Sequence, residues 1–277
     1  MHTVKHALTV DLEDWFHVCG AGPCPQVPQE SWRVAETGRR VLDLLDEFDI
    51  KATFFVLGVV AEAEPALIEQ IAACGHEIAS HGYSHRQLHE LEPEEFNEEL
   101  ELTEGLVQRL TGKRPRGFRA PQWSLTSRTH WADDILVERG YCYDSSRNPL
   151  LFVGEMGLPR HPYQIAASQG TLWEIPPMVT ETRTANLPTG GGWGFRFFPQ
   201  QMIETTIDAY EQAGYPAVLY LHPRELDPQG PRLSLPALKR FVTYGTRSDA
   251  ADRLRGLLAR YSFHTLEEMV AAWQSAS

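Results

Sequence analysis

Residues 77–85 read Glu-Ile-Ala-Ser-His-Gly-Tyr-Ser-His, a short strand-like run that ends in two histidines, His81 and His85. Side chains four positions apart face the same way on a helical turn, so these two imidazoles can point at one metal ion. Far upstream, an apolar run ends in the acidic residues 11–14, Asp-Leu-Glu-Asp. Two imidazoles and a carboxylate are a common ligand set for a catalytic divalent metal. The two segments together predict a metal site.

Strand-like and helical segments alternate along the chain. The clearest helix is residues 93–111, with Pro93 at its start and Gly112 after its end. The other predicted helices are 33–48, 65–74, 130–139, 254–261 and 265–275, and the predicted strands are 6–10, 52–57, 77–80, 117–119, 141–143 and 217–221. Repeated β-α units indicate parallel strands with helical crossovers, so we expect an α/β fold with a barrel of parallel strands.

Five polar residues each come directly after a predicted strand: Asp11, His81, Arg119, Asp144 and His222. In a barrel of parallel strands, the carboxyl ends of the strands gather at one face, where active sites lie. We therefore expect these five side chains to form one site.

The length of 277 residues fits a single domain over residues 1–277, with a core supported by 42% hydrophobic residues. The segment 148–198 is rich in Gly, Pro and aromatic residues, and we expect short strands and long loops there, inserted so as to cover the site. The four cysteines have no Cys-x-x-Cys spacing, so we expect free buried thiols and not a zinc site or a disulfide framework.

The net charge of −12 disfavours nucleic acid or an anionic membrane as a partner. The longest apolar run, residues 52–61, is too short for a membrane span. The amino terminus shows no signal-peptide pattern, so the sequence favours a cytoplasmic protein. The oligomeric state is left open.

Five motifs occur in order along residues 4–222. They are Thr-Val-Asp-Leu-Glu-Asp at 9–14, Ser-His-Gly-Tyr-Ser-His at 80–85, Arg-Ala-Pro-Gln-Trp at 119–123, Tyr-Asp-Ser-Ser at 143–146 and Leu-His-Pro at 221–223. This series resembles the motifs of the polysaccharide deacetylase family, the NodB-homology carbohydrate esterases. The segments 11–17 and 190–199 are similar to the branch associated with exosortase and exopolysaccharide gene clusters. The resemblance implies an irregular, distorted (β/α) barrel.

The resemblance also implies catalytic roles. Asp11 matches the catalytic base, which takes a proton from the attacking water. Arg119 matches the arginine that holds this aspartate ionised and oriented. His222 matches the histidine that protonates the leaving amine, and Asp144 matches the carboxylate that orients His222.

The metal ligands implied by the resemblance are His81, His85 and one carboxylate. The family usually has a second aspartate directly after the base, but Leu12 occupies that position here. Glu13 shares a strand face with Asp11 and is favoured as the third ligand. Asp14 is the alternative. The metal would be a divalent ion, with zinc favoured and iron, cobalt or manganese also compatible.

Three residues are candidates for substrate binding. Trp123 is a candidate wall residue, Leu221 would line a pocket for the acetyl methyl group, and Trp193 would stack on sugar rings. Plain core packing is an alternative for both tryptophans. The resemblance implies a metal-dependent hydrolase of C–N bonds that removes N-acetyl groups from an exopolysaccharide or its sugar precursor.

The sequence leaves other functions open. One is a small-molecule amide or ureide hydrolase on the same scaffold, and another is a relative that binds carbohydrate without turnover. The sugar, the polymer, and the choice between N- and O-deacetylation are open as well.

Overall fold

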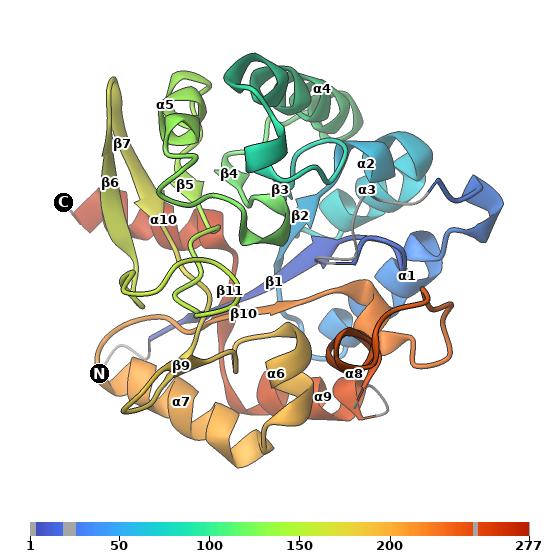
Figure 1. Cartoon of the computed structure of the whole chain (residues 1–277), viewed down its shortest axis with the longest axis vertical. Coiled ribbons are helices and arrows are strands. Elements are labelled where there is room, and N and C mark those ends of the chain that lie inside the picture. The colour runs from blue at the N-terminus through green and yellow to red at the C-terminus, as the bar shows by residue number, and fades with distance from the viewer. Residues whose placement is uncertain (1–3, 19–25, 246–248, 277) are drawn as a thin grey trace.

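The computed structural model describes residues 4–18, 26–245 and 249–276. One sheet holds nine strands, in the order β10-β1-β2-β3-β4-β5-β7-β6, with β11 also paired to β1 (Figure 1). The strands are β1 (His6–Leu12), β2 (Thr53–Val56), β3 (Glu77–Ser80), β4 (Gly117–Phe118), β5 (Tyr143–Asp144), β6 (Tyr163–Ala167), β7 (Gly170–Glu174), β10 (Val218–Leu221) and β11 (Phe263–His264).

All neighbouring strands in this sheet pair in parallel, except β6 with β7. Irregular backbone joins the two sides of the curled sheet. The amide of Met178, shortly after β7, donates to the carbonyl of Val218 on β10 (2.8 Å), and the amide of Tyr220 donates to the carbonyl of Gly190 (2.9 Å). The expected distorted (β/α) barrel of parallel strands is confirmed.

The helices pack around the sheet (Figure 1). They are α1 (Val34–Asp46), α2 (Gly58–Ala63), α3 (Pro65–Ala73), α4 (Pro93–Thr111), α5 (Trp131–Glu138), α6 (Gly192–Phe197), α7 (Gln200–Gln212), α8 (Ala237–Tyr244), α9 (Ala250–Arg260) and α10 (Leu266–Ala276). The 3₁₀ turns are η1 (Gln29–Ser31), η2 (Leu88–Glu90), η3 (Pro121–Trp123) and η4 (Pro223–Leu226). No helix among the described residues is long and apolar enough to cross a bilayer.

The segment 148–198 is more than a cover of loops. It contributes β6 and β7 to the main sheet, where β7 lies between β5 and β6, and it forms a separate two-stranded sheet of β8 (Thr180–Glu181) and β9 (Asn186–Leu187). Its glycine-rich end forms α6, where glycine disfavours a helix on intrinsic propensity alone. Tertiary packing decides here, because Phe195 of α6 joins the main hydrophobic core.

The expectation of buried thiols is wrong for the two cysteines that the structure describes. Cys74 is exposed at the end of α3. Cys142 is half-buried, and its sulfur accepts hydrogen bonds from the guanidinium of Arg116. Cys19 and Cys24 lie outside the described residues. Burial was the wrong expectation because Cys74 follows the last helical turn, where the chain passes over the surface.

The carboxyl group of Glu77 is buried at the start of β3. It accepts hydrogen bonds from Thr53 Oγ1 (2.6 Å) and Tyr143 Oη (2.5 Å). Burial raises its pKa to about 7, which outweighs the opposite effect of these hydrogen bonds. The folded chain therefore binds a proton that the unfolded chain releases near its ordinary pKa of about 4.3. The stability due to that proton is present at low pH and is lost as pH rises through about 7.

Glu77→Gln, which mimics the protonated group, should change how stability depends on pH. The native chain should lose on the order of 3 kcal/mol of stability between pH 4 and 8 that the variant does not lose. The free energy of unfolding of the variant, minus that of the native chain, should therefore increase by this amount. Denaturant unfolding at a series of pH values measures this, with Glu69→Gln on the exposed face of α3 as the control. Native and Glu77→Gln curves that run parallel would contradict the assignment.

Candidate active site and metal centre

The end of β1 separates polar from apolar side chains. Alternation along a strand places Asp11 and Glu13 on one face and Leu12 on the other. Leu12 is fully buried in the main core, where its side chain lies near α1 and α3. Leu12 therefore serves packing, and the acidic residues on either side of it turn toward the carboxyl end of the sheet.

Glu13, His81 and His85 form a compact buried group. One ligand atom from each lies within 4.8 Å of the others, and this is the group among the described residues that could hold a metal ion. Glu13 Oε1 lies 2.9 Å from His85 Nε2 and 3.2 Å from His81 Nε2. The two histidines come from the loop that follows β3, and the glutamate directly follows β1.

Hydrogen bonding sets the protonation of His81. Its Nδ1 lies 2.7 Å from the carbonyl oxygen of Arg119. A carbonyl only accepts hydrogen bonds, so Nδ1 carries a proton, and Nε2 is the ring nitrogen that faces Glu13. This orientation is the one that a histidine needs to bind a metal through Nε2.

The charge state of Glu13 also suits a metal ligand. Burial opposes its ionisation, but the nearby charges of His85, His222 and Arg224 together with the hydrogen bond from His81 hold its pKa well below the ordinary range. An ionised carboxylate with two imidazoles matches the donor set of catalytic zinc sites. These three residues therefore fit a divalent metal ion.

The structure does not bring Asp14 to the histidines. Its Oδ2 accepts the backbone amides of Arg33 (2.8 Å) and Val34 (3.0 Å), which caps the start of α1, and its Oδ1 accepts the amide of Trp15. The amide of Asp14 donates to His17 Nδ1. With its oxygens used at a helix end, Asp14 lies outside the group of Glu13, His81 and His85, although the sequence offered it as the alternative metal ligand.

Arg119 is completely buried and holds Asp11. Its Nη1 donates to Asp11 Oδ1 (2.6 Å) and to Thr9 Oγ1 (2.8 Å), and its Nε and Nη2 donate to the carbonyl and hydroxyl of Ser145. The guanidinium also lies 4.1 Å from the ring centre of Phe55. The arginine is fixed on all sides, so it fixes Oδ1 of Asp11 and leaves Oδ2 on the side of His222.

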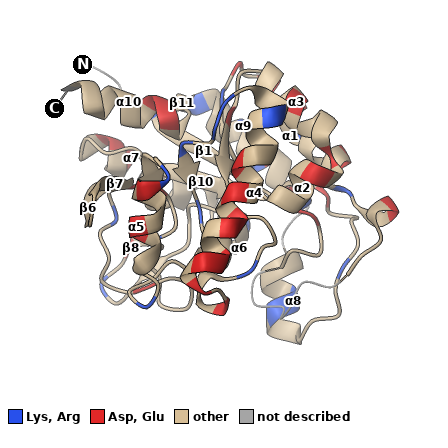
Figure 2. Ribbon diagram, turned by 90° about the horizontal axis from the view of Figure 1, so that it is seen from above, with Lys and Arg blue, Asp and Glu red and all other residues tan. Residues whose placement is uncertain are grey.

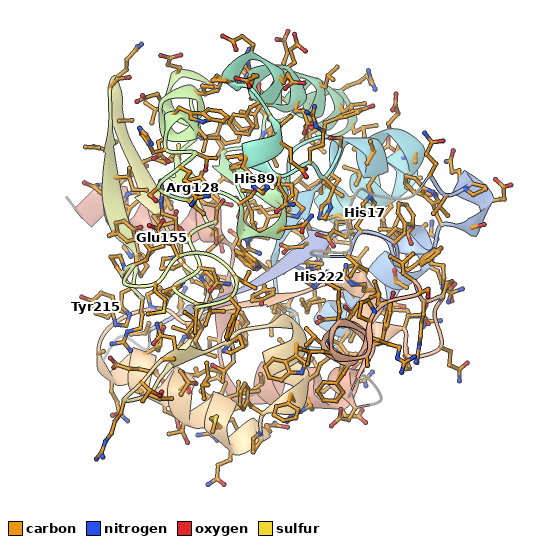
Figure 3. The ribbon with its side chains drawn as sticks, in the orientation of Figure 1. His17, His89, Arg128, Glu155, Tyr215 and His222 are labelled. Atoms are coloured by element: carbon orange, nitrogen blue, oxygen red, sulfur yellow. The ribbon has the colours of Figure 1, made fainter. Side chains whose placement is uncertain are left out.

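His222 faces the two acidic residues from β10. Its Nε2 lies 3.8 Å from Asp11 Oδ2 and 3.9 Å from Glu13 Oε2. Its Nδ1 lies 3.4 Å from Glu225 Oε1, within η4. Figure 3 shows His222 and His17 on neighbouring segments near the middle of the molecule.

Among the residues that the structure describes, no hydrogen bond or ion pair joins Asp144 to His222, although its motif led us to expect Asp144 to orient His222. Its carboxylate accepts the hydroxyl of Ser146 and lies 3.5 Å from Arg147 Nη1, next to Glu174. Ser146 also accepts the amide of Ala120 (2.7 Å). Asp144 therefore supports the backbone around Arg119, and Glu225 takes the place beside His222.

Glu225 is a site residue that sequence reasoning missed. It is buried, and burial opposes its ionisation, yet the hydrogen bond to His222 and the charge of Arg196 lower its pKa. Arg224 was missed as well, and its Nη1 donates to Glu13 Oε2 (2.6 Å) and to the carbonyl of His17 (2.9 Å). The available signal was position, because both follow His222 within three residues.

The predicted substrate residues differ in their surroundings. Leu221 is buried at the end of β10, beside His222. Trp123 is buried against Tyr220, with ring centres 4.9 Å apart, and lies over Arg119. Trp193 lies on α6, stacked on Phe197 at 4.9 Å. The structure thus brings Leu221 and Trp123 to the site, and it places Trp193 in a separate aromatic group.

Strained backbone is concentrated at this site. Among the described non-glycine residues, four have positive φ: Asp49, His85, Gln122 and Trp123. Such conformations are costly and persist where the surrounding structure requires them. Three of the four lie at the site: His85 is a metal-ligand candidate, and Gln122 and Trp123 belong to the Arg119 motif. The strain is therefore found mainly where side chains are directed at the metal-ligand group.

Two family models match the chain. A model described as polysaccharide deacetylase matches residues 27–136, and one described as a domain of unknown function, DUF3473, matches residues 145–271. A peptidoglycan-N-acetylglucosamine deacetylase of Bacillus cereus is 36% identical over 160 residues, which cover 52% of this chain and 58% of that protein. The chain spans about half the length of the curated relatives it matches.

Solved structures agree on the fold. A Mycobacterium smegmatis protein assigned as a polysaccharide deacetylase superposes with a TM-score of 0.64 at 24% identity, covering 87% of this chain and 77% of that one. The allantoinase Puue superposes with a TM-score of 0.63 at 17% identity, covering 98% and 90%. With its motifs and its match to the family model, the part of the chain at residues 27–136 belongs to the polysaccharide deacetylase (NodB-homology) family.

Proposed function

We propose that this protein is a metal-dependent hydrolase that removes acetyl groups from N-acetylated carbohydrate and releases acetate. The main observation behind this proposal is that His222 Nε2 lies 3.8 Å from Asp11 Oδ2, beside the buried group of Glu13, His81 and His85. Relatives named as peptidoglycan deacetylases support the same reaction. This combination supplies a base, an acid and a set of metal ligands around one point.

The metal would be held by Glu13, His81 and His85. When bound, a divalent ion supplies polarisation of the acyl carbonyl and a lower pKa for water, and zinc suits this donor set. Asp11 accepts the proton of the attacking water, because Arg119 keeps one carboxylate oxygen engaged and the other oxygen faces His222. His222 then carries a proton to the leaving nitrogen as the C–N bond breaks. Leu221, buried beside His222, borders the space for the acetyl methyl group.

The finer assignments belong to the proposal as well. We propose an exopolysaccharide or its sugar precursor as the carbohydrate, following the resemblance of segments 11–17 and 190–199, and a cytoplasmic location. The carbohydrate class is supported by the names of the relatives, and the choice of polymer depends on the resemblance alone.

Acetate release from oligomers of N-acetylated glucosamine, galactosamine and mannosamine tests the function. We expect acetate that disappears with a chelator and returns when zinc or cobalt is added. Metal binding without acetate from any of these oligomers would contradict the carbohydrate assignment and favour a small-molecule C–N hydrolase. Failure to bind metal would contradict the proposed centre itself.

Glu225 should act as a positioning residue for His222. Glu225→Gln keeps the shape but removes the negative charge beside Nδ1, so kcat should fall by about 10- to 100-fold while KM stays nearly unchanged. Asp144→Asn is the matched comparison. The family pattern assigns the orientation of His222 to Asp144, so it predicts the loss of kcat in that variant instead. We expect its main effect on thermal stability, because Asp144 lies in a buried cluster with Arg147. Loss of kcat in Asp144→Asn alone would contradict this assignment.

A further inference from the structure

Large apolar side chains are exposed in two groups. Among the described residues, nine such side chains are exposed, and seven of them fall in or beside two segments. The loop after β5 exposes Leu151, Phe152 and Met156, whereas α8 exposes Leu238, Phe241 and Val242, with Phe197 beside it. Phe152 is 93% exposed and Leu238 is 77% exposed. The rings of Phe197 and Phe241 lie 6.0 Å apart, which joins α6 to the α8 group.

Both groups belong to the face that carries the site. The loop at 148–157 follows the carboxyl end of β5, and α8 follows that of β10 through η4. The carboxyl ends of parallel strands share one face of such a fold. In the view of Figures 1 and 3, His222 lies between Glu155 of the loop and helix α8. The two apolar groups therefore flank the site.

The charge near α8 differs from that of the whole chain. Residues 228–248 contain four basic residues, Arg232, Lys239, Arg240 and Arg247, and no Asp or Glu, although the chain carries a net charge of −12. Arg247 lies outside the described residues, whereas Arg232 and Arg240 are exposed. Figure 2 shows α8 with basic colouring and the acidic residues gathered on other helices such as α4.

We propose that α8 and the loop at 151–156 dock the protein on the surface of an anionic lipid bilayer. Exposed Leu, Val, Met and Phe side chains can enter the boundary of acyl chains, and basic residues beside them attract anionic headgroups. The net charge of the chain does not oppose this, because charges more than about 10 Å away are screened at physiological salt.

Two other occupants fit less well. Carbohydrate is bound by flat aromatic rings with polar partners, and this surface also exposes the aliphatic Leu151, Leu238 and Val242. A second copy of the chain packed through this face would place Arg232 and Arg240 of both copies in one interface, which like-charge repulsion disfavours. An anionic lipid surface satisfies both the aliphatic and the basic side chains.

Docking in this way turns the face with Glu13, His81 and His85 toward the bilayer. If the proposed function holds, the favoured substrate is then carbohydrate carried on a lipid, since its acetyl groups lie near the membrane surface. This consequence rests on the proposed function, whereas lipid binding itself does not require activity. The two can therefore fail separately.

Sedimentation of the full chain with vesicles tests the docking. The protein should sediment with vesicles of phosphatidylcholine and phosphatidylglycerol, less with phosphatidylcholine alone, and less as salt is raised. Phe152→Ser and Leu238→Ser should each weaken binding by about tenfold. Arg240→Gln should weaken binding and reduce its dependence on salt. Leu102→Ser, an exposed leucine of α4 that is 53% exposed, is the matched control and should bind as the native chain does.

Three results would overturn the proposal. One is no sedimentation with the anionic vesicles, and another is an equal loss of binding in Leu102→Ser and Leu238→Ser. The third is a stable dimer, measured by light scattering, that Phe152→Ser or Leu238→Ser dissociates. That last result would assign the surface to a second copy of the chain.

Discussion

Asp11→Asn should lower kcat for acetate release by about 10³-fold or more while the protein still binds its metal. Asparagine has nearly the shape of aspartate and can still accept a hydrogen bond from Arg119 through its carbonyl oxygen. It cannot take a proton from water, which is the role that the geometry gives to the free oxygen of Asp11. The loss should therefore appear in kcat and leave the group of Glu13, His81 and His85 able to bind metal.

Loss of folding must be separated from loss of chemistry in this variant. Asp11→Asn leaves Arg119 with a buried charge and one fewer anionic partner, which is destabilising. Thr9→Val is a matched control, because it removes another acceptor of Arg119 Nη1, 2.8 Å away, without removing a base. We expect Thr9→Val to keep most of its kcat. Similar losses of kcat in both variants would show that Asp11 acts only through the position of Arg119.

Strand ends made much of this site predictable from the sequence. β1, β3, β4 and β10 are each followed directly by a polar residue, and the motifs at 9–14, 80–85, 119–123 and 221–223 mark these four strand ends. The helix at 93–111 and the strand at 77–80 have the same bounds in the structure. Strong periodicity, proline and glycine at the ends, and the need to bury one face set these limits.

The same reasoning failed where contacts depend on side-chain direction. Asp144 follows a strand as expected, but four strands separate β5 from β10 in the sheet, and its carboxylate turns toward Glu174 of the neighbouring β7. Glu225 lies beside His222 because η4 is a tight 3₁₀ turn. Such a short turn has no hydrophobic periodicity from which the sequence could predict it. Segment 170–174 joined the sheet because of its tertiary partners, while its own sequence is short and mixed in polarity.

Glu13→Gln should weaken the binding of zinc or cobalt by about 100-fold or more, whereas Asp14→Asn should leave it nearly unchanged. Glutamine keeps the length of the side chain but replaces an anionic oxygen with a neutral one. It also removes the negative charge that the hydrogen bonds from His85 and Arg224 stabilise. Titration calorimetry and metal content measure the effect without any assay of activity.

Asp14→Asn is the sharpest control for Glu13→Gln, since the two residues are adjacent in the chain and carry the same charge. Its carboxylate caps α1 through the amides of Arg33 and Val34, so its replacement should lower stability by about 1 kcal/mol and spare the metal. The reverse pattern, with metal binding lost in Asp14→Asn and kept in Glu13→Gln, would show that the carboxylates exchange places when metal binds. Equal loss in both would mean that the start of α1, and not one ligand, controls the site. Loss in Glu13→Gln alone is expected, because of the two carboxylates only that of Glu13 lies within 3.2 Å of both histidine Nε2 atoms.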